Sequence, residues 1–574
     1  MRRTARSGVS LIDTIVGTAL MLVVFLGIGA AFQLSVEVIT NNKARAGAIA
    51  LANERMEYLR SLSYSELGTS GGVPAGTLAQ NETQTLNGVP YARRTLIVYQ
   101  DDPKDGTGGA DANHITADYK LAKVDVTWED RTGATRHITI ASRFSPVGIE
   151  TAVPGGTLVV NAVNAAGAAL SGAAVRIVNA STSPAIDLTM YADTDGRVTL
   201  IGAPAAADYE VTVSEPGYST AKTYGTTASN TNPAPPNLSV TNDHTTTATL
   251  AIDVVGSIAV RSWTPITDAS WTDSYADTTK IASQTDTAVA GGALTLAGTP
   301  YPAAGTSQSI AIGPSLLARW KTLSWSATVP AGTIARFQVY DGAGAALIPD
   351  GQLPGNSSGF VASPVDLSGI STSTYPSLRT LVTLSSVDPD VTPSVASYAI
   401  GYEAGPTPLP SLPFSVRGAK TIGSGPSGTL YKYSVATSTD GAGSRPLTGL
   451  EWDSYAITVD GASGYDIARS CPPRPVSLAP GAALTLDLYL AAHTANSLLV
   501  DVRSGTTSEL LAGMEVVLFR SGYAATSTTD ACGQAFFSSL TAAGYSASAS
   551  STGYATVVAS STVSGASTLE LIVN

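Results

Sequence analysis

The chain is poor in charge, cysteine and histidine. Only 13% of its 574 residues are charged, and it contains two cysteines and four histidines. It has no CxxC pair and no Cys/His cluster, which argues against a structural zinc site. It also lacks an HExxH motif and a phosphate-binding GxxxxGK loop. These absences remove the most recognisable signatures of zinc-dependent and nucleotide-dependent enzymes.

Basic clusters are missing after the first few residues, and the net charge is −12. A basic patch is the usual footprint of a nucleic-acid-binding protein, so we expect no nucleic acid partner. One string, residues 355–359, fits the serine nucleophile elbow, but that motif needs a strand–turn–helix and this region shows no helical pattern. The histidines are scattered over the chain. We therefore expect a protein that is not an enzyme.

Small residues and turn formers are abundant instead, with 55 glycines and 32 prolines. This composition suits β-rich modules joined by turns rather than a helical enzyme. A chain of 574 residues is too long for one domain and indicates about four or five.

An apolar segment follows a basic leader that contains Arg2, Arg3 and Arg6 and ends at Gly8. Residues 14–36 carry no formal charge. At about 1.5 Å of rise per residue, a helix of this length spans roughly 34 Å and can cross a bilayer. Asp13 is the one charge at its start, and a carboxylate in hydrocarbon costs about 2.5–3.5 kcal/mol, so this acid indicates a function.

Residues 7–17, SGVSLIDTIVG, resemble the prepilin leader and N-terminal helix of type IV pilins and type II secretion pseudopilins. The resemblance implies that a prepilin peptidase cuts between Gly8 and Val9 and that the new amine of Val9 is methylated. It also implies that Asp13, at mature position five, pairs with the N-terminal amine of a neighbouring subunit. The family usually has Phe and Glu at these two mature positions. The resemblance continues through residues 51–64, LANERMEYLRSLSY.

Two other interpretations of the N-terminus stay open. A conventional secretory signal could be cut at the small residues 29–31. A plain membrane anchor is the second, because Lys43 and Arg45 after the span blur the positive-inside signal. The pilin-like interpretation is favoured, since Asp13 interrupts the apolar region and the helical pattern continues well beyond residue 31.

The next region alternates strictly between two faces, as in residues 119–128, YKLAKVDVTW. Residues 91–99 and 135–144 behave similarly, which predicts three or four antiparallel strands against the helix. An acidic, glycine-rich loop lies between these strands, and its oxygens could bind calcium. The spacing matches no EF-hand, and a solvated polar loop is the alternative. The candidate calcium ligands are Asp101, Asp102, Asp105, Asp111 and Asp118; no other cofactor is expected.

After residues 154–156, Pro-Gly-Gly, a pattern of strands, Asp-Gly turns and Gly-Tyr pairs occurs three times. The copies resemble the small sandwich modules of the carboxypeptidase-regulatory and Cna-type B families. Some Cna-type modules carry a Lys–Asn isopeptide bond, but residues 157–163 and 498–502 contain no lysine, so none is expected in those two copies.

A longer stretch without this pattern suggests a jelly-roll-like domain. Its four tryptophans, Trp263, Trp271, Trp320 and Trp325, could stack on a sugar, although large aromatics more often fill sandwich interiors. Outside the cytoplasm, Cys471 and Cys532 could form a disulfide, and two separate thiols are the alternative.

The predicted fold is an α+β N-terminal pilin module, with a long helix and a small antiparallel sheet, followed by several all-β sandwich domains. The predicted segments are a leader (1–8), the long helix (9–72), a β head (73–150), a sandwich (155–256), a jelly-roll-like domain (257–405) and two further sandwiches (412–493 and 496–574).

The predicted function is that of a minor type IV pilin-like subunit, placed in or at the tip of a filament and displaying its modules for adhesion. Its expected partners are prepilin peptidase, other pilin subunits, the cytoplasmic membrane before assembly, and a glycan or surface ligand. The mature chain would lie at the cell surface. A pseudopilin of a type II secretion or DNA-uptake machine and a membrane-anchored surface stalk are the alternatives.

Overall fold

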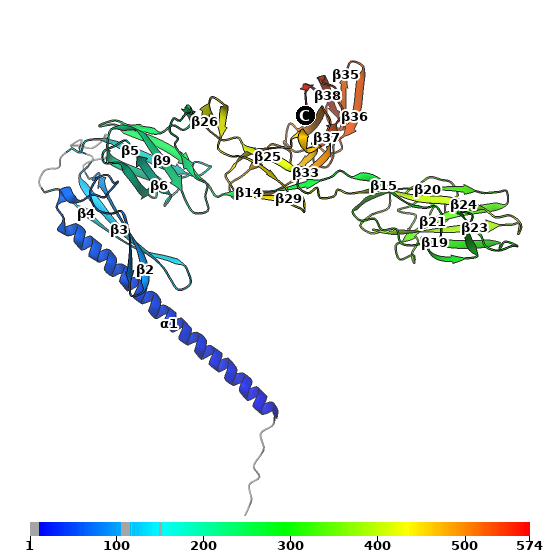
Figure 1. Ribbon diagram of the computed structural model, residues 1–574, viewed down its shortest axis with the longest axis horizontal. Coiled ribbons are helices and arrows are strands. Elements are labelled where there is room, and N and C mark those ends of the chain that lie inside the picture. Colours follow the sequence, from blue (N-terminus) through cyan, green and yellow to red (C-terminus); the bar gives the residue numbers. More distant parts are fainter. Residues whose placement is uncertain (1–10, 105–114, 116, 148–151) are drawn as a thin grey trace, which may run out of the picture.

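One long helix precedes a series of β-sheets in the computed structural model, which describes residues 11–104, 115, 117–147 and 152–574 (Figure 1). The predicted fold class, a helix-and-sheet N-terminal module followed by all-β sandwiches, is confirmed.

The helix α1 (Leu11–Ser61) is unbroken, in keeping with the absence of proline before Pro74. Its N-terminal part extends free of the rest of the chain (Figure 1). Its C-terminal part is buried on one side, where Ala48, Ala52 and Leu59 are fully covered. A short 3₁₀ turn, η1 (Tyr64–Glu66), follows it.

The head is a four-stranded antiparallel sheet against this C-terminal part of α1. Its order is β1-β2-β3-β4, with β1 (Asn81–Leu86), β2 (Val89–Gln100), β3 (Tyr119–Glu129) and β4 (Thr135–Phe144). The alternation in β3 places Ala122, Val124 and Val126 under the helix, where all three are fully buried.

The first sandwich packs against the head so closely that Val73 and Val98 of the head region belong to its core. Its sheets are β13-β5-β8 and β10-β9-β6-β7, with β12 on β9. Its strands are β5 (Gly156–Val163), β6 (Ala174–Asn179), β7 (Ile186–Tyr191), β8 (Arg197–Ala203), β9 (Ala206–Ser214), β10 (Ala221–Lys222), β12 (Leu238–Val240) and β13 (Thr245–Ala251). Gly196, in its Asp-Gly turn, has a φ of +71°, and an added Cβ would lie 2.5 Å from the Ala162 carbonyl oxygen.

The second sandwich is discontinuous in sequence. Its sheets are β29-β14-β33-β31 and β28-β25-β30-β32. Its strands are β14 (Gly256–Trp263), β25 (Pro413–Gly418), β28 (Ser434–Ser438), β29 (Ser444–Leu450), β30 (Asp453–Thr458), β31 (Tyr465–Cys471), β32 (Val476–Leu478) and β33 (Ala483–Ala492), with the 3₁₀ turn η3 (Gly461–Ser463). A hairpin of β26 (Thr421–Gly425) and β27 (Gly428–Tyr431) pairs with β11 (Asn232–Pro233), which follows β10 in the chain.

The strand β14 requires a correction to the predicted boundary at residue 257. It was expected to begin the jelly-roll-like domain, but it pairs parallel with β33 and antiparallel with β29. Ile258 and Val260 are fully buried in the core of the second sandwich. The domain that follows is therefore an insertion between β14 and β25.

This inserted domain has two facing sheets, β17-β18-β24-β20-β22 with β15 on β24, and β16-β19-β23-β21. Its strands are β15 (Thr267–Asp273), β16 (Ile281–Thr285), β17 (Thr287–Ala290), β18 (Ala293–Leu296), β19 (Ala304–Ser309), β20 (Leu317–Thr328), β21 (Thr333–Asp341), β22 (Val365–Asp366), β23 (Leu378–Ser386) and β24 (Ser394–Ala404). It projects away from the second sandwich (Figure 1).

The third sandwich ends the chain, with sheets β37-β34-β40 and β36-β35-β38-β39. Its strands are β34 (Ser497–Ser504), β35 (Glu515–Arg520), β36 (Tyr523–Thr528), β37 (Gln534–Phe537), β38 (Ala543–Ser550), β39 (Val557–Val563) and β40 (Ala566–Val573).

Candidate functional sites

The free part of α1 is long and apolar enough to cross a membrane, by length and composition. Its most apolar stretch has a mean hydropathy of 2.4, and none of it is buried within the chain. Phe25 and Phe32 are 61% and 70% exposed. The hydroxyls of Thr18 and Ser35 donate to the carbonyl oxygens of Thr14 and Ala31, at 2.9 and 2.8 Å. These bonds satisfy the hydroxyls inside an apolar surrounding.

Three glycines in this part, Gly17, Gly27 and Gly29, have no packing role among the residues that the structure describes. A Cβ built on any of them would meet nothing within 4 Å. Glycine costs about 1 kcal/mol relative to alanine inside a helix. Small residues allow helices to approach closely in apolar surroundings, so a contact outside this chain would account for them.

The predicted processing residues are only partly covered by the structure. Gly8 and Val9 lie outside the described residues, and Asp13 lies in the first turns of α1, with its side chain outside the description. Cleavage, methylation and the Asp13 pairing therefore stay predictions.

The junction between α1 and the head contains a buried charge cluster that the sequence did not reveal. Arg55 and Arg93 are only 7% and 5% exposed. Glu82 accepts from Arg93 at 2.9 Å and lies 3.6 Å from Arg55. Arg55 also donates to Thr95 Oγ1 at 3.1 Å, and burial lowers its pKa. The cluster fixes the orientation of the helix on the sheet.

The candidate calcium loop is only partly described. Asp105 and Asp111 lie outside the described residues, whereas Asp101, Asp102 and Asp118 lie at the base of the loop. The carboxylate of Asp118, which is 3% exposed, accepts a hydrogen bond from the Asp102 backbone N–H. Within the described ranges, no group of three or more His, Cys, Asp or Glu residues could hold a metal ion. Calcium binding by the whole loop stays a prediction.

The tryptophans serve mainly as core residues. Trp320 is fully buried and donates its Nε1–H to the Tyr375 carbonyl at 3.0 Å. Trp325 stacks on Phe337 with ring centroids 4.1 Å apart, and Trp271 also packs against the core of the inserted domain. Trp263 lies on β14, in the second sandwich.

The string at residues 355–359 has a structural role. Asn356 is fully buried, and its side chain exchanges two hydrogen bonds with the backbone of Val339, at 2.7 and 2.8 Å. It holds the loop against β21, and the next element along the chain is the strand β22 rather than a helix.

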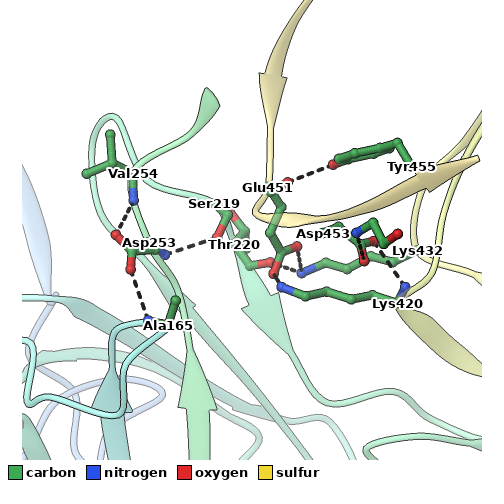
Figure 2. Close-up of polar contacts among 11 residues, drawn as sticks. Ala165, Ser219, Thr220, Asp253, Val254, Lys420, Lys432, Glu451, Asp453 and Tyr455 are labelled. Carbon is green, nitrogen blue, oxygen red and sulfur yellow. Dashed lines mark hydrogen bonds and ion pairs between the residues drawn. The ribbon is translucent and has the colours of Figure 1, made fainter. Parts of the chain in front are cut away.

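The first and second sandwiches are joined by polar contacts (Figure 2). The Glu451 carboxylate binds the ammonium groups of Lys420 at 2.6 Å and Lys432 at 2.5 Å. Lys432 also donates to the Thr220 carbonyl of the first sandwich at 2.7 Å, and burial lowers the pKa of Lys420. Asn230 donates to Ile422 at 2.9 Å beside the β11–β26 pairing. A side chain of each sandwich thus donates to a backbone carbonyl of the other.

The second and third sandwiches are linked covalently, because Cys471 and Cys532 form a disulfide with Cα atoms 5.8 Å apart. Cys471 ends β31, and Cys532 lies in the turn before β37. Arg469 lies 3.4 Å from Asp530 across the same junction. The even cysteine count indicated that a bridge was possible, but its position between two modules had no sequence signal.

No family model and no curated protein matches the chain. Among solved structures, the chain is similar to the TIE protein of Bacillus anthracis, with 10% identity, 86% of this chain and 73% of that chain covered, and a TM-score of 0.15. BcpA, the major pilin subunit of Bacillus cereus, gives 10% identity, coverages of 73% and 99%, and a TM-score of 0.14. GBS52, a minor pilin of Streptococcus agalactiae, gives 13%, coverages of 29% and 83%, and a TM-score of 0.12. At these TM-scores the chains do not superpose as wholes, and the likenesses identify no family for this chain.

Proposed function

We propose that this chain is a minor type IV pilin-like subunit that joins a filament through α1 and displays its β modules for adhesion, without enzymatic activity. The observation that carries the proposal is the division of α1 into two parts. The N-terminal part is apolar and bare, and the C-terminal part is packed on an antiparallel sheet.

A bare apolar helix needs an apolar surrounding, because exposing it to water forfeits about 25 cal/mol for each Å² of apolar surface. Lipid supplies that surrounding to a precursor, and the helices of other subunits supply it in a filament. The glycines at 17, 27 and 29, which nothing inside the chain requires, support the second environment.

The processing chemistry follows from the residues at the start of the helix. Cleavage after Gly8 by prepilin peptidase would remove the basic leader and free the amine of Val9. Asp13 would then need a compensating cation once it is buried among helices, because an unpaired buried carboxylate is costly. The amine of an incoming subunit is the nearest cation that such packing supplies.

The bulk of the β modules favours rare or terminal incorporation. Four β domains follow the head, and repeating them in every subunit of a thin filament would cause clashes. A subunit at the tip can project them outward. Adhesion is therefore an argument from architecture, and the inserted domain, which projects furthest from the second sandwich in Figure 1, is well placed for it.

Processing is tested by mass spectrometry of the chain recovered from sheared surface fibres. We expect a mature N-terminus at methylated Val9, and we expect Gly8→Phe to trap the precursor in the membrane while Thr4→Ala is processed normally. Recovery of the chain with Met1 attached, and never in fibres, would overturn the proposal in favour of a surface stalk. A processed chain found only with a secretion machine would favour the pseudopilin alternative instead.

A further inference from the structure

A cavity of about 430 Å³ lies between the second and third sandwiches. Its walls come from β30, β31 and the loop after β31 on one side, and from β34, β37 and the start of β40 on the other. Cavities of this size between domains are common places for small ligands. The sequence carries no local signal for it, because its two walls are built from separate modules.

The two walls are held in place without a ligand. The Cys471–Cys532 disulfide ties them covalently. Gln534, which is 3% exposed, accepts from the Ser470 N–H of the second sandwich at 2.7 Å and donates to Asp501 of the third sandwich at 2.6 Å. A pre-formed site loses little entropy when it binds.

The cavity is lined by a half-buried cation with few partners. Arg474 donates one hydrogen bond, from Nη1 to the Ile457 carbonyl at 2.8 Å. Among the residues that the structure describes, its Nε–H is covered and finds no hydrogen-bond partner, and no acid forms an ion pair with the guanidinium. Burial lowers the pKa of Arg474 to about 10, still far above neutrality. A guanidinium partly removed from water in this state is costly unless an anion pairs with it.

Asp501 stands in the other wall, close enough for its charge to act on Arg474 but beyond ion-pair distance. It is 8% exposed, and burial raises its pKa. Serine and threonine residues at 497, 567 and 568 line the same wall. The wall that carries Arg474 therefore offers a donor for an anion, and the opposite wall offers acceptors for hydroxyl groups.

We infer that this cavity binds a carboxylated sugar of the uronic acid class. The terminal nitrogens of the Arg474 guanidinium can donate to a carboxylate, and hydrogen bonds between charged groups are stronger than those between neutral groups. Asp501 and the hydroxyl side chains match sugar hydroxyls, and Leu499 and Phe536 supply apolar wall surface. Inorganic phosphate fits less well, because the Asp501 carboxylate repels a second strongly charged oxygen group.

The inference deepens the adhesive role and rests on it, since it names the ligand class that the displayed modules would take. The strand β37, which forms part of the cavity wall, lies apart from the free part of α1 in Figure 1, so insertion of that helix into lipid or a filament leaves this region uncovered.

The test is calorimetric titration of the purified full-length chain in detergent with glucuronate, glucose and inorganic phosphate. We expect glucuronate to bind and glucose and phosphate to bind at least about tenfold more weakly, as the loss of one charge-assisted hydrogen-bonded contact implies. Arg474→Gln and Asp501→Asn should each weaken glucuronate binding by about tenfold or more. Arg520→Gln is the matched control, because Arg520 ends β35 of the third sandwich, donates to Thr541 and does not line the cavity.

Folding of each variant is checked by its thermal transition and by the absence of free thiol. Equal binding of glucose and glucuronate, or glucuronate binding that is unchanged in a folded Arg474→Gln variant, would overturn the inference. Binding of phosphate alone, or of none of the three probes, would overturn it as well. The titration needs neither cleavage nor filaments, so its failure is distinct from a failure of the Gly8 experiment.

Discussion

Individual charged side chains decide how firmly α1 is held on the head. Glu82 neutralises two arginines that are almost completely buried, at 2.9 and 3.6 Å. By contrast, Glu57 and Arg60 pair on the open face of the same helix, where their side chains are 68% and 53% exposed. Buried pairs are costly to break and surface pairs contribute little. Loss of the buried Glu82 pairs should therefore destabilise the protein much more than loss of the exposed Glu57–Arg60 pair.

Glu82→Gln should destabilise the helix–sheet unit by about 1–3 kcal/mol, because it removes the anion that two buried guanidinium groups share and leaves Arg93 only the exposed Glu54 at 3.9 Å. The measurement is the thermal transition of the head in the full-length chain by scanning calorimetry. Glu57→Gln is the control and should change stability by less than about 0.5 kcal/mol. Equal effects of the two substitutions would contradict the structural role assigned to Glu82.

Lys120 gives the head a specific pH dependence. It is 3% exposed, donates to the carbonyls of Tyr64 and Leu67 at 2.6 and 2.8 Å, and burial lowers its pKa to about 8. The unfolded chain, with an ordinary lysine pKa, binds more protons between about pH 8 and 10. The free energy of unfolding should therefore rise with pH in that window, by at most about 1.4 kcal/mol per pH unit.

This slope is measured by denaturant titration of the full-length chain at several pH values. In a Lys420→Met background, which removes the other lysine whose pKa burial lowers, Lys120→Met should remove the rise whatever its effect on stability at pH 7, and Lys123→Met, on the more exposed face of β3, should retain it. A slope that persists in Lys120→Met would show that another group is responsible.

At the scale of elements, the sequence predicts strands better than it predicts their partners. The alternation at residues 119–128 anticipated β3 almost to its ends. It could not show that β14 pairs with β33, because a period of two indicates which residues are buried but not in which sheet. Arg261 of β14 binds Asp487 of β33 with two hydrogen bonds of 2.7 Å, although the two residues are 226 positions apart in the sequence.

The candidate sites also differ in how much of each can be predicted from the sequence. The N-terminal segment is local, so its apolar length and Asp13 were visible in the sequence. The Arg55–Glu82 cluster and the cavity at Arg474 depend on residues brought together by tertiary packing, and charge alone gave them no distinguishing signal.

The two ends of the inserted domain lie side by side, which makes the domain removable. Thr264 donates its N–H to the Thr407 carbonyl at 2.8 Å, and Trp263 forms a bridge with Pro408. Replacing residues 267–404 by a short glycine–serine linker should leave the second sandwich folded, because a short loop closes at little entropic cost. The checks are a retained Cys471–Cys532 disulfide and an unchanged thermal transition for the second and third sandwiches. Aggregation or free thiols would contradict this modular view.

At the scale of the whole molecule, the β domains are not connected as a simple linear series, because the inserted domain branches from the second sandwich. The first sandwich leads into one end of β14, and the inserted domain leaves from its other end. The third sandwich is attached to the second by the chain and by the disulfide, and it lies outside the path that runs from the first sandwich through β14 to the inserted domain. An inserted domain bound to a surface would therefore be connected to α1 through β14.

This topology has a mechanical consequence. A load applied between α1 and the inserted domain crosses the second sandwich along β14, a strand that is already extended at about 3.3 Å per residue, so the second sandwich's share of the path has almost no length to release. Optical-tweezer pulling from the head to the inserted domain should show no lengthening step from the second sandwich, whereas pulling from the head to Asn574 should show one. Under tension, β14 would then transmit the force across the second sandwich, while the other strands of that sandwich and the whole third sandwich would carry no load.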